Sequence, residues 1–149
     1  MTIRASRLGN DVVGSLLLET ALALMLALPV IFGVFEICMF TYTLSVLEDA
    51  ARMGVRYAIV HGSDSGNCSG PGSRCADSAA ANVQSAVQQN AANSLHDTSA
   101  MTVNVSYPDG SSSPPSRVIV AIRYTYVPYL NLPGLAQGMS ATAEGRIVY

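Results

Sequence analysis

The chain has 149 residues, of which 50% are hydrophobic and 12% are charged, with a formal net charge of −2. This charged share is about half of the usual value and is typical of a membrane protein. The 8 basic residues are all Arg and are scattered, which excludes a basic patch for nucleic acid. The length allows one small domain with an anchor and excludes two sizeable domains.

Residues 1–14 are a short, mildly basic leader. Arg4 and Arg7 precede the first apolar run, and Asp11 is the only acidic residue before it. Short segments that carry Arg tend to stay on the cytoplasmic side of a membrane. We therefore expect a cytoplasmic N-terminus, with the remainder of the chain exported.

Residues 15–47 are an apolar run that predicts a transmembrane helix. Such a helix would be about 50 Å long at 1.5 Å per residue, against a hydrocarbon core of about 30 Å. It can therefore cross a bilayer once and still project from it. The run is too long for a secretory signal peptide, whose apolar core has about 7–15 residues, so we expect it to stay in the membrane.

A carboxylate, Glu19, lies near the start of this run. If a peptidase cut after Gly14, the new amino group of Ser15 would lie one helical turn from Glu19. A charge inside a membrane helix costs about 2.5–3.5 kcal/mol and needs a partner, which the Ser15 amine of a neighbouring copy would supply. The alternative is that Glu19 lies at the headgroup boundary without a specific role. These residues alone leave both interpretations open.

Further along the run, Pro29 removes one backbone hydrogen bond and is expected to kink the helix. Residues 48–60 predict an amphipathic extension, because apolar and small side chains recur every three or four positions. They are Phe40, Leu44, Leu47, Ala51, Gly54 and Ala58. Glu48 and Arg52 have the spacing of an ion pair on the solvated face.

Residues 61–75 are a loop that contains two cysteines. Cys68 and Cys75 are expected to form a disulfide if this part is exported to an oxidising space. Their spacing is not the Cys-x-x-Cys of redox proteins, and a zinc site needs more ligands than the loop offers. We expect the third cysteine, Cys38, to be buried in the membrane run.

The remaining chain predicts one helix and one sheet. Residues 76–95 show helical spacing, with Asp77 or Ser78 as the capping residue. Residues 100–149 predict a small antiparallel sheet, because apolar side chains alternate in three segments. They are 101–107, 117–127 and 140–149, the last with Ala141, Ala143, Ile147 and Tyr149 facing inward. The expected fold class is α+β, with the long N-terminal helix as the spine of the exported domain.

An ordered set of these features resembles the TadE-like family, the pilus-assembly pseudopilins of the tight-adherence branch of the type IV pilus machinery. It consists of Gly14, Glu19, Pro29, Gly33, Glu36 and the segment EDAARMGVRYA at 48–58. The resemblance covers about a third of the chain. Leu18 and Thr20 are mild departures from the family pattern.

This resemblance implies a single-pass protein of the bacterial inner membrane. It implies cleavage between Gly14 and Ser15 by a prepilin peptidase, and a role for Glu19 in subunit processing and alignment. The implied partners are the lipid bilayer, the peptidase, and other pilins, pseudopilins and pilus-assembly proteins. The mature protein would act in pilus assembly, as a minor pilin associated with adhesion.

We expect no enzymatic activity, no cofactor, no metal and no small-molecule substrate. The sequence offers no nucleophile with an adjacent base, no phosphate-binding loop and no metal-spaced cluster. A second hypothesis is an unprocessed single-pass protein whose exported domain binds a partner in the same surface apparatus. A third is an enzyme or sensor domain on a membrane tether, which ligand binding or activity of the exported domain would support.

Overall fold

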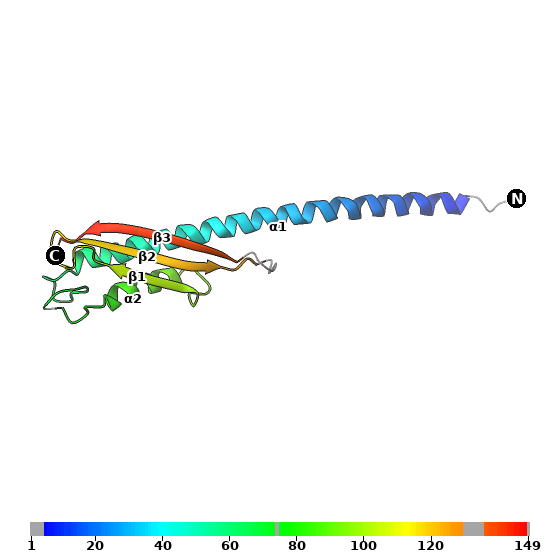
Figure 1. The fold of residues 1–149 in the computed structure, drawn as a ribbon. Coiled ribbons are helices and arrows are strands. Elements are labelled where there is room, and N and C mark those ends of the chain that lie inside the picture. The colour runs from blue at the N-terminus through cyan, green and yellow to red at the C-terminus, as the bar shows by residue number, and fades with distance from the viewer. Residues whose placement is uncertain (1–4, 74, 130–135, 149) are drawn as a thin grey trace. The chain divides into compact units, whose positions relative to one another are not determined.

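The computed structural model describes residues 5–73, 75–129 and 136–148, and it confirms the expected α+β fold. The chain divides into two compact units, residues 1–39 and residues 40–149. Its elements are α1 (Ala5–Val60), α2 (Ala81–Ala92), β1 (Met101–Ser106), β2 (Arg117–Tyr126) and β3 (Gln137–Arg146) (Figure 1).

The first unit consists of the N-terminal part of α1. The helix begins at Ala5, so the described part of the leader is helical as well. Its sequence is rich in Leu, Ala and Met, which are strong helix formers. The helix also continues through Pro29. Whether this proline kinks the helix, as we expect, stays a prediction.

The second unit is built on an antiparallel sheet with the strand order β1-β2-β3. In the centre of the sheet, Val103 pairs with Ile122, which pairs with Ala141 on the other side. One face of the central strand is buried as its alternation predicts, because Val118, Val120 and Ile122 are fully inaccessible. A three-stranded sheet with one apolar face needs a covering layer.

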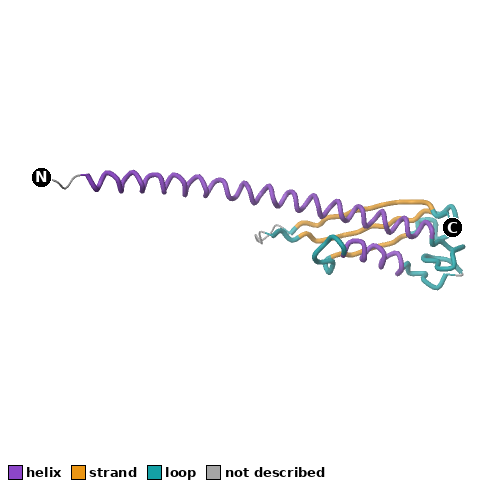
Figure 2. Tube along the Cα trace, turned by 180° about the vertical axis from the view of Figure 1, so that it is seen from behind, coloured by secondary structure: helices purple, strands orange, loops and turns teal. Residues whose placement is uncertain are grey.

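Both helices supply that layer by covering the same face of the sheet (Figure 2). The C-terminal part of α1, from Phe40 onward, contributes the fully buried Leu47, Ala51 and Ala58. From α2, the core receives Val83, Val87 and Ala91, all with 0% exposure. The amphipathic stripe that the sequence predicts along α1 is thus the face that packs on the domain. The contact between α1 and the rest of the domain begins before residue 48, because Thr43 and Leu47 of the predicted apolar run are buried.

Two glycines let the helix approach its neighbours closely. A Cβ on Gly54 of α1 would collide with a methyl group of Val87 and lie 3.3 Å from one of Val120. A Cβ on Gly145 of β3 would lie 2.5 Å from Val55 Cγ1. Real Cβ atoms are not found that close to other carbons, so the packing requires glycine at both positions.

The second helix is shorter than the range 76–95 that the sequence predicts. It begins at Ala81 because Ala80 adopts a left-handed conformation, with φ 56°, which is incompatible with a continuing helix. Asp77 nevertheless caps the helix, since its carboxylate accepts hydrogen bonds from the backbone N–H groups of Ala81 (2.7 Å) and Asn82 (2.8 Å). The structure therefore confirms Asp77 as a capping residue, but the helix begins five residues later than the predicted range.

The third strand is shifted from the predicted range 140–149 to 137–146. Its pairing with β2 extends from Tyr126 opposite Gln137 to Arg117 opposite Arg146, so the length of β2 sets its limits. Ala141 and Ile147 are buried as expected, although Ile147 lies just past the strand. Ala143 is half-buried, and Tyr149 lies outside the described residues.

Candidate functional site

The segment from Gly14 to Glu19 lies within α1 and is uncovered. Leu16, Leu17 and Leu18 are 57%, 65% and 73% exposed, and the side chain of Glu19 is exposed too. Nothing lies within 4 Å of the position that a Cβ of Gly14 would take. The bond between Gly14 and Ser15 is therefore free of steric cover in the described chain, although it lies inside a helix.

The apolar surface continues without cover along the rest of the first unit. Large side chains on every side of the helix, from Leu22 to Ile37, are 47–72% exposed. The part of α1 from Gly14 to Val60 contains an 18-residue window with a mean hydropathy of 2.4, and none of the residues in that window is buried. By length and composition, α1 can span a membrane.

Glu19 is the only ionisable residue between Ser15 and Phe35 in the sequence. Beside it, the hydroxyl of Thr20 donates to the carbonyl oxygens of Leu16 and Leu17, both at 3.0 Å. The threonine, which departs from the family pattern, thus satisfies its polar group inside its own helix. The exposed carboxylate of Glu19 is therefore the charged group that this part of the helix presents to its surroundings.

A cluster of hydrogen-bonded polar groups lies beside the disulfide loop, which follows the end of α1. Cys68 and Cys75 form the expected disulfide, with their Cα atoms 5.4 Å apart. Next to this loop, Ser69 is fully buried and its hydroxyl donates to Asp77 at 2.6 Å, while Tyr107 donates to the Ser69 carbonyl at 3.0 Å. These bonds tie the disulfide loop to α2 and to the residue after β1.

The electrostatics of this cluster follow from partial burial. Desolvation on its own raises the pKa of Asp77, but hydrogen bonds from Ser69, Asn82 and Ala81 outweigh it and keep that pKa below its ordinary value. Burial, assisted by the negative charge of Asp77, raises the pKa of Tyr107 to about 12. Asp77 is thus charged and Tyr107 neutral at physiological pH, as a structural hydrogen-bond network requires.

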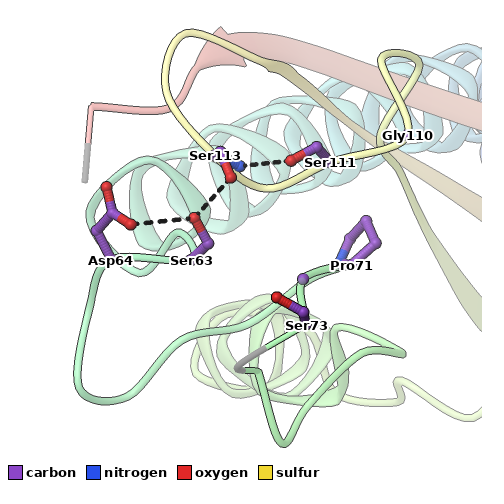
Figure 3. Close-up of a pocket in the computed structure, with 8 residues that line it drawn as sticks. Ser63, Asp64, Pro71, Ser73, Gly110, Ser111 and Ser113 are labelled. Carbon is purple, nitrogen blue, oxygen red and sulfur yellow. Dashed lines mark hydrogen bonds between the residues drawn. The ribbon is translucent and has the colours of Figure 1, made fainter.

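A polar pocket of about 560 Å³ opens beside the disulfide loop (Figure 3). The disulfide loop (residues 61–75) and the loop between β1 and β2 line it, mainly with hydroxyl groups and with the carboxylate of Asp64. The hydroxyls bond to one another, since Ser63 Oγ and Ser113 Oγ are 2.8 Å apart. The sequence analysis missed this pocket, because its only signal is serine-rich loop composition in segments about fifty residues apart in the chain.

The sequence-derived site residues thus fall into two places. Gly14, Ser15, Glu19 and Pro29 share the uncovered helix, whereas Cys68 and Cys75 belong to the folded domain. Cys38, expected to be buried, is exposed on α1. Among the described residues, no group of three or more His, Cys, Asp or Glu side chains is arranged to hold a metal ion.

Comparison with known proteins adds one match. Residues 14–56 match the model of a family described as TadE-like protein. No match was found among curated proteins or among solved structures. The matching segment begins at Gly14, contains Glu19, and ends at Arg56 in the part of α1 that packs on the sheet. Residues 14–56 of this chain are therefore similar to the TadE-like family, in agreement with the order of the motifs in the sequence.

Proposed function

We propose that this protein is a minor pilin-like subunit, a pseudopilin, that acts in the assembly of a tight-adherence pilus. The observation that carries the proposal is the coincidence of the TadE-like segment with the uncovered apolar helix. Such a surface is stable only in lipid or against other apolar helices. The protein therefore crosses the bacterial inner membrane once and joins other pilins through the same helix.

The proposal includes cleavage between Gly14 and Ser15 by a prepilin peptidase. Both residues lie in α1, so the bond must leave the helix before it enters a protease cleft. Glycine lowers the cost of this local unwinding, because it destabilises a helix by roughly 0.5–1 kcal/mol relative to alanine. It also presents no side chain that would obstruct the cleft.

Cleavage gives Glu19 its role. The new amino group of Ser15 and the Glu19 carboxylate are separated by four residues, or about 6 Å along the helix axis. The carboxylate of one subunit is then matched in depth with the amino group of a neighbour that is displaced by about one turn. This pairing offsets the cost of the buried charge and sets the stagger between neighbouring helices.

The disulfide supports export of the second unit. Such bonds persist in oxidising compartments and are rare in the cytosol. An exported domain after a cytoplasmic leader also agrees with the position of Arg4 and Arg7 before the apolar run. The N-terminus therefore stays in the cytoplasm, and residues 40–149 face the other side.

The experiment that tests the proposal is N-terminal sequencing of the protein extracted from its native membrane. We expect a chain that begins at Ser15. We also expect Gly14→Val to block cleavage, because a branched side chain obstructs the protease cleft. The matched control is Gly33→Val, which makes the same change at another helical glycine with open space around it, and it should be cleaved normally.

A chain that begins at Met1 or Thr2 would contradict the processing step. In that outcome, the protein is an uncleaved single-pass anchor, and its function lies in a partner of the exported domain. Mature-length protein from Gly14→Val would likewise argue against this site. Neither outcome is expected if the peptidase recognises the TadE-like segment from its first residue.

A further inference from the structure

The sheet has an end with exposed apolar side chains, close to Phe40. Figure 1 shows β2 ending and β3 beginning at the end of the sheet opposite the chain's C-terminus. At this end, the ring of Tyr126 meets the ring of Phe40 edge to face, with centroids 5.6 Å apart. Phe40 is the first residue of the second unit.

Just beyond β2, two large side chains face solvent. Val127 is 59% exposed and Tyr129 is 67% exposed, whereas Tyr126 between them and the core is 7% exposed. The nearby Tyr42 is 50% exposed, and its hydroxyl donates to the carbonyl of Ser94 at 3.4 Å. Exposed Tyr and Val side chains therefore follow the buried Tyr126 at this end of the sheet.

Covalent continuity sets the depth of Phe40 relative to a membrane that α1 crosses. A helix crosses the hydrocarbon core in about 20 residues. If the crossing starts between Ser15 and Glu19, it ends at about residues 34 to 38. Phe40 follows shortly after, and its ring contact with Tyr126 joins the end of β2 to this residue.

We propose that this end of the sheet, formed by Val127 and Tyr129 with Tyr42, is a second membrane contact that rests on the headgroup layer. Tyrosine is enriched at this boundary because its ring is apolar and its hydroxyl is polar. The contact would hold the exported domain against the bilayer before the subunit enters a filament. The inference depends on the proposed membrane insertion of α1.

Single tryptophans test this inference, because the chain contains no Trp. The full chain carrying Tyr129→Trp is reconstituted into vesicles of phosphatidylcholine and phosphatidylglycerol. The phosphatidylcholine is brominated near the headgroup end of one acyl chain. Bromine quenches tryptophan fluorescence only at short range, so quenching reports contact with the upper part of the bilayer.

The structure supplies two matched positions. Val148→Trp changes a side chain with similar exposure, 60%, at the opposite end of the sheet, where the Val148 N–H donates to the Ile59 carbonyl at 3.2 Å. A ten-residue strand separates the two ends by about 33 Å. Phe32→Trp lies in the apolar segment and reports insertion of α1 itself.

We expect strong quenching of Phe32→Trp and at least about twofold stronger quenching of Tyr129→Trp than of Val148→Trp, since only the first end reaches the headgroups. If Phe32→Trp is quenched while Tyr129→Trp and Val148→Trp remain alike, the second contact is wrong and the membrane helix stands. If Phe32→Trp is not quenched, the membrane helix and the second contact both fail.

Discussion

Gly54 lies where α1, α2 and β2 meet, and its replacement sets two physical effects against each other. Alanine is a better helix former than glycine by about 1 kcal/mol, so Gly54→Ala would stabilise an isolated helix. In the folded domain, however, the new Cβ would collide with a methyl of Val87 and approach a methyl of Val120 to 3.3 Å. Both valines are fully buried.

The magnitudes favour the collision. Extra carbon in a close-packed core typically costs about 1–3 kcal/mol, because the surrounding side chains have nowhere to move. Subtracting the gain in helix propensity leaves a net loss of about 1 kcal/mol for Gly54→Ala. For a domain of this size, that corresponds to a decrease in Tm of about 5 °C. Gly54→Val should lose more, because its two extra methyl groups enter the same space.

Thermal unfolding of the full chain in detergent tests this expectation. The near-ultraviolet circular dichroism of the domain tyrosines reports loss of tertiary packing around the sheet. Gly33→Ala is the matched control, since it makes the same change in the same helix with nothing within 4 Å. Its Tm should equal that of the unaltered chain or exceed it. An increase in Tm for Gly54→Ala would refute the packing of α1 against α2 and β2.

The remaining predictions concern the membrane carboxylate, the disulfide and the helix cap. Glu19→Gln keeps shape but removes charge, so membrane insertion should persist while pilus assembly is impaired; unchanged pilus formation would contradict the role of this carboxylate. Replacing Cys68 and Cys75 together by Ser should lower the free energy of unfolding of the domain by about 2.5 kcal/mol, because the disulfide no longer restricts this short loop in the unfolded chain. If adding a reductant to the unaltered protein leaves its Tm unchanged, that result would contradict the disulfide. The pKa of Asp77 is lowered in the folded state, so its charge contributes stability above pH about 4 that is lost as the pH falls further. Asp77→Asn should therefore lower the Tm at pH 7, and the difference in Tm between the variant and the unaltered protein should become smaller at acidic pH. If that difference is as large at pH 2 as at pH 7, the effect does not come from the charge of Asp77.

Much of the local structure was predictable because it depends on short-range patterns. Hydrophobicity alone identified the apolar helix, and strict alternation identified the buried face of β2, where Val118, Val120 and Ile122 are inaccessible. The motif from Gly14 to Glu19 predicted the TadE-like segment, which the family match confirms. In each of these cases, the deciding information lies within one helix or strand.

The limits of the elements were less predictable, because distant contacts set them. Helix α2 begins at Ala81 rather than near residue 76, since Asp77 folds back to bond with Ser69 across the disulfide loop. Strand β3 begins at Gln137 because β2 offers a partner as far as Tyr126. The helix or strand propensity of a segment does not reveal these distant partners, which are Ser69 for Asp77 and β2 for β3.

The sequence by itself therefore determined the apolar helix and the strand faces, because hydrophobic periodicity is a local property, whereas the processing site at Gly14 and Ser15 stays a prediction. Only the tertiary structure decided which distant groups meet. It placed Gly54 against Val87 and brought Tyr126 to Phe40 at the start of the domain. The physical reason is that side chains far apart in the sequence pack according to the register of the sheet and the path of the loops, and these are settled only when the whole core is buried.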